Sequence, residues 1–393
     1  MKDIQYGAPM PRLEELDVLR GFALLGVFIV HFVGLAFYEL PTDEDVLFSW
    51  LDNPLHSLTV LASDLLFLNK ANTLFATLFG IGFWIMLERF QQSGRDFRAL
   101  YLRRLGFLFC LGVVNVVFIF PGDVLHEYAL IGLILFLLRR IKPSTMLLAG
   151  ILFALAARPL LESDSMLGFP ADTAIQMQYD AIGSGNYSVW LQTMVSLHVK
   201  EEILHGGILA WVFYVLGRFF IGSWLVRKQL IYSLAEKTGW MKRHVRWVLP
   251  LGLLIELLTT LMWEEVIISP VWLREALHYI GVPMVAVGYA LALFLLYHSS
   301  YQSLVKRIFA PVGRIALTAY IGHCVIYAVL FLPLGFNLLS VVAPFTGLLI
   351  ALGVFALFNL LGTFSLHHFG YGPLEYLWRW ATYGRRPMTV KSM

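Results

Sequence analysis

Ten long apolar stretches run through the chain, and the segments between them alternate in charge. A helix needs roughly 20 apolar residues to cross about 30 Å of hydrocarbon. Hydrophobic residues make up 59% of the 393 residues and charged residues only 14%, whereas a soluble domain carries about 25% charge. Lipid offers the backbone no hydrogen-bond partner, so each span is expected to be a helix. We expect an all-α polytopic membrane protein, with residues 1–393 as one integral membrane domain and spans near 18–38, 71–90, 105–121, 124–141, 145–162, 207–226, 245–263, 279–298, 308–333 and 341–361.

The basic residues predict how the chain is oriented, because Lys and Arg gather on the cytoplasmic side of a membrane. With the N-terminus inside, 23 of the 29 Lys and Arg fall in cytoplasmic segments or at their edges, four in outer loops and two within spans. Of the 26 acidic residues, 17 fall on the outer side. Both termini are therefore expected in the cytoplasm of a multi-pass protein of the cell inner (plasma) membrane. Membrane lipids are its expected partners, and a net charge of +3 gives no reason to expect nucleic acid.

Two outer segments, at about 39–69 and 163–206, are long enough to have structure of their own. The first is acidic and then apolar, which is typical of a half-helix that re-enters the membrane. The second contains a turn signal at residues 183–186 and then an amphipathic stretch, which is expected to lie along the membrane surface or to cap a cavity. The apolar side of that stretch consists of Trp190, Met194, Leu197 and Ile203.

Ionisable side chains at membrane depth need a partner or a function. His31 lies eleven residues after Arg20, which places it about 16 Å deeper along a helix. Arg20 has the simpler interpretation of an anchor at the cytoplasmic edge, and a lone buried histidine is more often a packing residue than a catalyst. His31 still deserves a chemical hypothesis, because imidazole titrates near pH 6.5 and can move protons at neutral pH.

Further polar residues mark both edges of the membrane. Asp123 and His126 occupy the short outer turn of a tight hairpin between the third and fourth spans. They are expected to orient an acceptor or to face water, and with so few ligands in sight no metal is expected. Arg314 and Thr318 are expected to share one face of the ninth span, with His323 nearby.

Three more charged residues fall within or at the end of spans and require partners there. Lys70 is expected to pair with Asp64 or Asp123. A pair between Glu256 and Arg218 is the simplest arrangement for two isolated charges on consecutive spans.

Five strings stand out between residue 16 and residue 384, at residues 16–26, 70–83, 121–125 with 128–130, 313–320 and 372–379. Together they resemble the motifs of the YeiB-like membrane proteins, a family described as domain of unknown function 418. The resemblance covers nearly the whole chain and is specific for the family, but it implies little about activity. His31 and His323 stand where that family usually has Asn and Gln.

The opening of the first span is also similar, more distantly, to the transmembrane acyltransferases. These include the sugar O-acyltransferases of the acyltransferase-3 type and the heparan glucosaminide acetyltransferases. In the O-acyltransferases a histidine follows the glycine of a Leu-Arg-Gly string by ten positions, as His31 follows Gly21 here. Their Arg-x-x-x-Arg motif has no match in spacing, since the nearest arginines are Arg98, Arg103 and Arg104.

This resemblance implies transfer of an acyl group from cytoplasmic acetyl-CoA, or another acyl-CoA, to an extracytoplasmic or lipid-linked acceptor such as a glycan. His31 would be the general base or the acyl carrier, and Asp123 would act on the acceptor. A basic cytoplasmic mouth would attract the phosphates of the donor. The expected substrate-binding residues are Arg20, Lys70, Asn72, Arg103, Arg104, His126, Arg314, Thr318, His323, Glu375 and Arg379.

A proton-coupled transporter, or a flippase for a lipid or glycan, would use the same buried groups without covalent chemistry. The halves of the sequence give no clear inverted repeat, which would be typical of a transporter. A cavity joining His31 to the cytoplasmic mouth and to the outer side would favour the enzyme. A cavity lined by Glu256 and Arg218 that excludes His31 would favour transport. A non-enzymatic scaffold is disfavoured by the number of ionisable groups at membrane depth.

Overall fold

The computed structural model describes residues 13–39, 50, 52–93, 97–161, 171–200, 207–339 and 341–384, and within these ranges the regular structure is entirely helical. A helix occupies each of the ten expected spans. They are α1 (Glu14–Ile29) continued by the π-helix η1 (Val30–Glu39), α4 (Lys70–Ser93), α5 (Phe97–Phe118), α6 (Leu125–Leu137), α7 (Pro143–Leu161), α11 (Gly207–Arg227), α12 (Thr238–Trp263), α13 (Val271–Tyr297), α14 (Gln302–Arg314) with α15 (Ala316–Phe331), and α16 (Pro344–His368).

Six helical segments in the described part of the chain are long and apolar enough to cross a membrane. They begin at Glu14, Pro54, Phe97, Thr238, Val271 and Pro344, and the α14–α15 pair makes a seventh if it counts as one span. These lengths and compositions agree with a polytopic helical membrane protein. The count of ten spans and the cytoplasmic termini remain predictions.

The ninth expected span, 308–333, is not one continuous helix. α14 and α15 meet at Ile315 with a bend of 77°, so Arg314 and Thr318 do not share one helix face, and that prediction is wrong. Pro311 has no N–H for the carbonyl of Arg307, and Asn359 of α16 donates its side-chain amide to that carbonyl instead (3.1 Å).

Glycines let α1 cross α14 closely at the break. A Cβ on Gly21 would collide with the carbonyl oxygen of Phe309, and a Cβ on Gly313 with that of Asp17. Because neither glycine has a side chain, the two backbones touch. Arg20 and Arg314, each next to one of these glycines, are consequently brought to the same region.

The outer segments form helices of their own. α3 (Pro54–Leu66) precedes α4, which agrees with the helical part of the prediction for 39–69. α9 (Ala171–Gly183) and α10 (Tyr187–His198) form a hairpin whose turn has Gly185 at φ 63° and the Asn186 side chain accepting from the N–H groups that open α10. The predicted apolar face of α10 is buried at Trp190 and Met194, whereas Ile203 lies outside the described residues.

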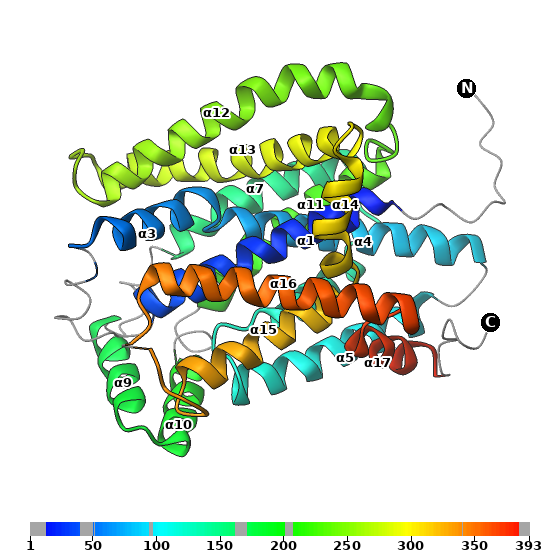
Figure 1. The fold of residues 1–393 in the computed structure, drawn as a ribbon. Helices are drawn as coiled ribbons and strands as arrows, with labels where there is room; N and C mark the ends of the chain where they lie inside the picture. The colour runs from blue at the N-terminus through cyan, green and yellow to red at the C-terminus, as the bar shows by residue number, and fades with distance from the viewer. Residues whose placement is uncertain are drawn as a thin grey trace.

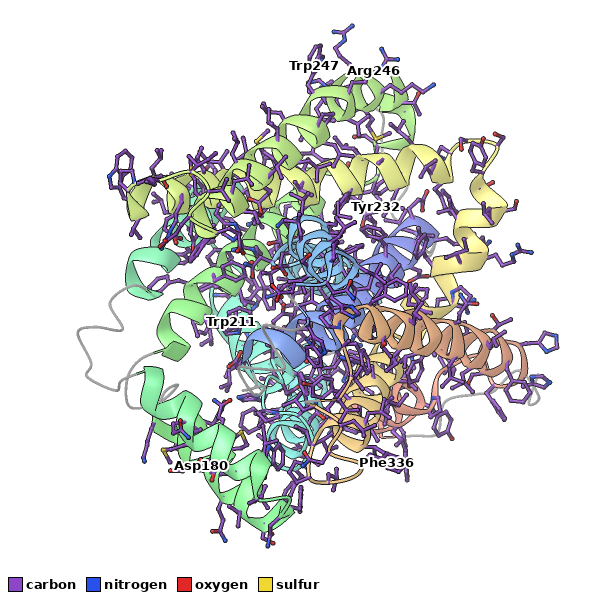
Figure 2. All side chains as sticks on the ribbon, turned by 60° about the vertical axis from the view of Figure 1, so that its left-hand side comes forward. Asp180, Trp211, Tyr232, Arg246, Trp247 and Phe336 are labelled. Atoms are coloured by element: carbon purple, nitrogen blue, oxygen red, sulfur yellow. The ribbon has the colours of Figure 1, made fainter. Side chains whose placement is uncertain are left out.

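The helices run roughly along one axis, and the elements at its two ends differ. In Figure 1 the short helix α17 (Pro373–Tyr383), which sequence analysis did not identify, lies at the end where α1 begins. The hairpin of α9 and α10 lies at the opposite end. α12 and α13 form a second hairpin along the side, and Figure 2 shows Arg246 and Trp247 pointing outward from α12.

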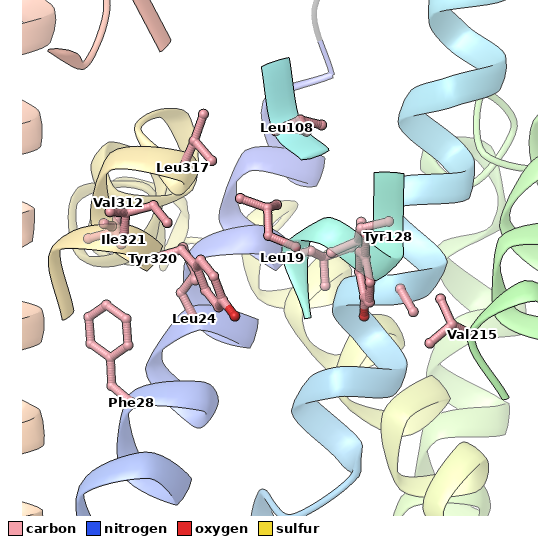
Figure 3. Close-up of a cluster of buried hydrophobic side chains, with 14 of the residues drawn as sticks. Leu19, Leu24, Phe28, Leu108, Tyr128, Val215, Val312, Leu317, Tyr320 and Ile321 are labelled. Atoms are coloured by element: carbon pink, nitrogen blue, oxygen red, sulfur yellow. The ribbon is translucent and has the colours of Figure 1, made fainter. Parts of the chain in front are cut away.

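The core is built where the helices converge on α1. Figure 3 shows side chains of several helices in one cluster, among them Leu24 and Phe28 of α1, Tyr128 of α6 and Tyr320 of α15. Leu24 and Phe28 are fully buried. This apolar packing fixes the positions of the two tyrosines, whose hydroxyl groups are the polar ends of an otherwise apolar cluster.

Candidate functional site

A cavity of about 620 Å³ opens among α1, α4, α5, α6, α14, α15 and α17. One part of its wall is charged, and five arginines contribute to it together with Asp17 and Glu375. The remaining wall is mostly apolar and aromatic, and it includes Tyr128 and Tyr320. The arginines are Arg20, Arg89, Arg104, Arg314 and Arg379.

Three of these arginines have defined contacts. Arg20 binds the carboxylate of Asp17 one helical turn earlier (3.0 Å). The guanidinium of Arg104 lies 3.4 Å from the centre of the Trp378 ring, and the indole N–H of Trp378 donates to the Arg104 carbonyl. The guanidinium of Arg379 lies 4.5 Å from the centre of the Tyr371 ring. A cation over an aromatic face keeps its charge while its orientation is restrained.

Glu375 and Thr318 are structural partners at the wall of this cavity. The carboxylate of Glu375 accepts from the N–H groups of Leu317 (2.7 Å) and Thr318 (3.0 Å) and from the Thr318 hydroxyl (2.6 Å). The same hydroxyl accepts from the N–H of Leu374 (3.0 Å). Each side chain therefore caps the other helix, Glu375 that of α15 and Thr318 that of α17. Burial raises the pKa of Glu375, and the hydrogen bonds from Thr318 oppose the shift.

His31 and His323 form a hydrogen-bonded pair, with Nδ1 of the former 2.8 Å from Nε2 of the latter. The His31 ring stacks on Phe120 at 4.8 Å between centres, and the fully buried His323 stacks on Phe28 at 4.5 Å. His31 lies just inside the π-helical part of the first span, a form that is often found at functional sites. One imidazole must donate and the other accept.

Neither histidine lines the cavity, but Tyr320 contacts both the cavity and the histidine pair. It lies in the cavity wall, and its ring centre is 5.2 Å from that of His323 one helical turn later. The cavity therefore does not include His31, which differs from the expected cavity joining His31 to the cytoplasmic mouth, and Tyr320 lies between its wall and the histidine pair. Glu256 and Arg218, whose cavity would have favoured transport, do not line it either.

A second polar cluster lies in the tight turn between α5 and α6. Asp123 accepts from the side-chain amide of Asn115 (2.9 Å) and from the N–H of Leu125 (3.1 Å). Its carboxylate lies 3.6 Å from Nδ1 of His126, and the ring of His198, at the end of α10, lies 5.5 Å from that of His126. Burial and the neighbouring His126 lower the pKa of His198. Within the described residues no group of three His, Cys, Asp or Glu is arranged to hold a metal ion.

The expected charge pairs on the other side of the bundle are wrong in their partners. Lys70 forms an ion pair with Glu256, both 2% exposed, and donates to the backbone carbonyl of Asp64. His278 extends this cluster, 3.3 Å from the Glu256 carboxylate.

Arg218 binds instead to the hydroxyl of Thr73 (3.0 Å) and to the carbonyl of Tyr214, and its guanidinium lies over the Tyr214 ring. The reason is geometric: α12 faces the start of α4, not the middle of α11. The sequence predicts each helix but not which charged side chains of different helices meet.

The remaining expected residues divide between the wall and the outside. Arg103 is exposed on α5 and does not line the cavity. Asn72 accepts a hydrogen bond from the hydroxyl of Tyr128 (2.6 Å) and so fixes a cavity-lining group. Sequence analysis did not single out Tyr320 and Trp378 as site residues, although both lie within strings that resembled the family, and a tyrosine one turn before His323 was a usable signal.

These features define a class of protein: a helical, polytopic membrane protein with an arginine-lined internal cavity next to a buried histidine pair. Similarity to known sequences supports a YeiB-like protein of the DUF418 family. The family model described as "Protein of unknown function (DUF418)" matches residues 225–385. No solved structure matches the chain.

Similar proteins occur in several bacteria. The chain is 28% identical to "Uncharacterized protein YxaH" of Bacillus subtilis, over 98% of this chain and 97% of that protein. It is 27% identical to "Uncharacterized protein YeiB" of Escherichia coli, over 95% and 97% of the two chains. It is 25% identical to an "Uncharacterized 39.9 kDa protein in amylase 3'region" of Bacillus acidopullulyticus, over 97% of both. None of these names states an activity.

Proposed function

We propose that the protein is a membrane acyltransferase, which takes an acyl group such as acetyl from cytoplasmic acyl-CoA and delivers it to an extracytoplasmic or lipid-linked acceptor such as a glycan. The observation that carries the proposal is the five-arginine cavity with the His31–His323 pair behind Tyr320. Groups suited to a phosphate-bearing donor lie on one side of that tyrosine, and imidazoles suited to acyl transfer lie on the other.

The cavity fits the chemistry of the donor. Guanidinium groups bind phosphate oxygens through paired, charge-assisted hydrogen bonds. The acids in the same wall are already engaged, Asp17 by Arg20 and Glu375 by the N–H groups of α15, so they oppose an anionic ligand less. The apolar part suits the thioester arm of the donor, and 620 Å³ falls within the roughly 300–1,000 Å³ typical of small-molecule sites.

The histidine pair supplies a nucleophile and a proton acceptor. If Nδ1 of His31 donates to His323, then Nε2 of His31 has a free lone pair. This nitrogen attacks the thioester carbonyl, a C–N bond forms, and the C–S bond breaks with its electron pair leaving on the CoA thiolate. The Nδ1 proton of His31 passes to His323 and finally to the thiolate. The acceptor hydroxyl then attacks the acyl-imidazole, and its proton restores the histidine pair.

The topology that this reaction needs is the one predicted from charge. We take ten spans, both termini in the cytoplasm of the inner membrane, and the segments at 39–69 and 163–206 outside. The arginine-lined part then faces the cytoplasm, where acyl-CoA is available. The outer cluster around Asp123 faces the acceptor.

Exchange of CoA tests the donor half of the reaction alone. Purified protein in lipid nanodiscs is mixed with acetyl-CoA and labelled CoA, without an acceptor. An acyl-carrying histidine predicts label in acetyl-CoA, and His31→Gln should lower exchange by about 100-fold or more. His244→Gln, on an exposed ring stacked on Trp240 of α12, is the matched control. Absence of both exchange and transfer in the wild type would refute the proposal, and transfer without exchange would make His31 a general base.

A proton-coupled transporter is the second candidate, and one observation favours it. Lys70, Glu256 and His278 form a buried ionic cluster that the acyl-transfer chemistry does not use. Buried ionisable groups in membrane proteins often mark proton paths. Proteoliposomes loaded with a pH-sensitive dye should acidify on addition of substrate if this reading is correct, and Glu256→Gln should abolish the signal while leaving CoA exchange intact.

A further inference from the structure

The polar cluster in the outer turn has the geometry of a histidine base held by a carboxylate. Asp123 is 2% exposed, and its two oxygens are fixed by Asn115 and by the N–H of Leu125. The oxygen bonded to Leu125 also faces Nδ1 of His126 at 3.6 Å. At 3.6 Å this is an electrostatic contact and not a hydrogen bond, but the nearby negative charge favours the imidazole tautomer with its proton on Nδ1, which leaves Nε2 as the basic nitrogen.

The neighbours of this pair come both from the outer hairpin and from the region of His31. On the outer side, the ring of His198 from α10 packs against His126 at 5.5 Å. On the inner side, the N–H of Asp123 donates to the carbonyl of Phe120, whose ring stacks on His31. The hydroxyl of Tyr320 meets the same turn at the N–H of Val124 (3.4 Å).

Buried atoms of this turn lack a hydrogen bond, among them two that flank the Asp123 carboxylate. Nδ1 of His126 and Oδ1 of Asn115 both lack one, although the side chains are only 7% and 1% exposed. An unsatisfied buried polar atom costs about 1–3 kcal/mol, so a structure keeps one where a ligand or a reaction uses it. The two atoms belong to opposite sides of the Asp123 carboxylate.

We propose that His126 is a catalytic residue of the acceptor half-reaction, with Asp123 as its positioning residue; this rests on the proposed acyl transfer. Nε2 of His126 takes the proton of the acceptor hydroxyl as its oxygen attacks the acyl group on His31. The new C–O bond forms, the C–N bond breaks, and its electron pair returns to His31. The proton then passes from His126 back to the His31–His323 pair.

The same cluster restricts the class of acceptor to uncharged alcohols. Asp123 and Glu127 place two buried carboxylates in the turn, 2% and 5% exposed. A phosphate or carboxylate next to the reacting hydroxyl would be repelled there. A protonated amine would first have to give its proton to a base, and the two carboxylates would stabilise its charged, unreactive form. A sugar hydroxyl meets the site's requirements, because it is neutral and becomes nucleophilic only when a base removes its proton.

The test separates the two half-reactions in the full-length protein in nanodiscs. CoA exchange reports the donor half. Transfer of labelled acetyl to octyl β-D-glucoside reports the acceptor half, with glucose 6-phosphate as the charged comparison. His126→Gln should lower transfer by at least about 100-fold and change exchange by less than twofold. Asp123→Asn should lower kcat for transfer and shift its pH profile, and the neutral glucoside should react at least tenfold faster than the phosphate.

Each outcome has a definite meaning. If His126→Gln exchanges CoA and transfers acetyl as fast as the wild type does, this inference is overturned and the proposed function stands. Parallel loss of exchange and transfer in a variant that unfolds at the wild-type temperature also overturns it. If His126→Gln unfolds, His126→Ala with added imidazole replaces it, and partial recovery of transfer by imidazole supports a base. If the wild type shows neither exchange nor transfer, the proposed function itself is refuted. His244→Gln should match the wild type in both assays.

Discussion

At the scale of single residues, the least predictable feature is the partner of His31. Depth and apolar neighbours marked His31 from the sequence, but His323 is 292 positions away and nothing local links the two. The YeiB-like pattern offers a test of what the pair does, because it usually has Asn and Gln at these positions. Two amides can keep the hydrogen bond that two imidazoles make, but amides do not take up protons.

We therefore expect the double variant His31→Asn/His323→Gln to fold, with a free energy of unfolding within about 1 kcal/mol of that of the wild type. Acyl transfer should fall by at least about 100-fold. His31→Ala alone leaves His323 buried without its partner and should cost roughly 1–3 kcal/mol of stability. Thermal unfolding in detergent and the transfer assay check both points. Full transfer by the double variant would mean that the pair serves only packing.

At the scale of elements, the sequence predicted where helices lie but not how they end against one another. Pro311 interrupts the backbone hydrogen bonds of α14, yet the break falls at Ile315, where a carboxylate from α17 caps the new helix. That carboxylate is 58 positions away from the N–H of Leu317. The string around Glu375 was recognisable as a motif, and only the fold shows that it is a cap.

The mutual cap of α15 and α17 predicts strong coupling. Glu375→Ala and Thr318→Val should each destabilise the protein by about 1–2 kcal/mol, and the double variant should cost less than the sum, since both changes remove one shared bond. The one bond that both changes remove is that from the Thr318 hydroxyl to the Glu375 carboxylate, and chemical unfolding of the four proteins measures the coupling through it. Additive losses would contradict the reciprocal arrangement.

Burial raises the pKa of Glu375 above its ordinary value of 4.5, and this gives a pH dependence. Between the unfolded and the folded pKa the folded state binds more protons, so the stability contributed by this group falls as the pH rises through that window. The Glu375→Gln variant lacks the titration. Its melting temperature relative to the wild type should therefore increase as the pH is raised from 4.5. A constant difference would show that the carboxyl titrates equally in both states.

The crossing of α1 and α14 makes a prediction about glycine. Gly313→Ala puts a methyl group onto the backbone oxygen of Asp17 and should destabilise the protein by about 1–3 kcal/mol, the usual cost of overpacking. Gly353→Ala is the matched control, because its Cβ would meet nothing within 4 Å in the middle of α16. There the better helix propensity of alanine should stabilise by up to about 1 kcal/mol. Equal effects at both sites would mean that the crossing is not tight.

At the scale of the whole molecule, composition and charge predicted the helical membrane class, and every expected span coincides with a helix. The arginine-lined cavity was not predictable as a cavity, since its walls come from residues as far apart as Arg20 and Arg379. The sequence did predict on which side of the membrane three of the cavity's arginines lie. Arg20, Arg104 and Arg379 all belong to segments that the charge rule assigns to the cytoplasm, and the fold brings them to one wall.

Orientation can therefore be tested at the two ends of the molecule. Ser184 is exposed in the turn between α9 and α10, and Lys228 is exposed just after α11. In a background with Cys110→Ser, Ser184→Cys should react with an impermeant maleimide added to intact cells, and Lys228→Cys should react only after permeabilisation. The expectation follows from the basic residues that surround Lys228 and the outer acidic segments. The reverse labelling pattern would turn the arginine-lined cavity away from cytoplasmic acyl-CoA and so remove the donor from the proposed reaction.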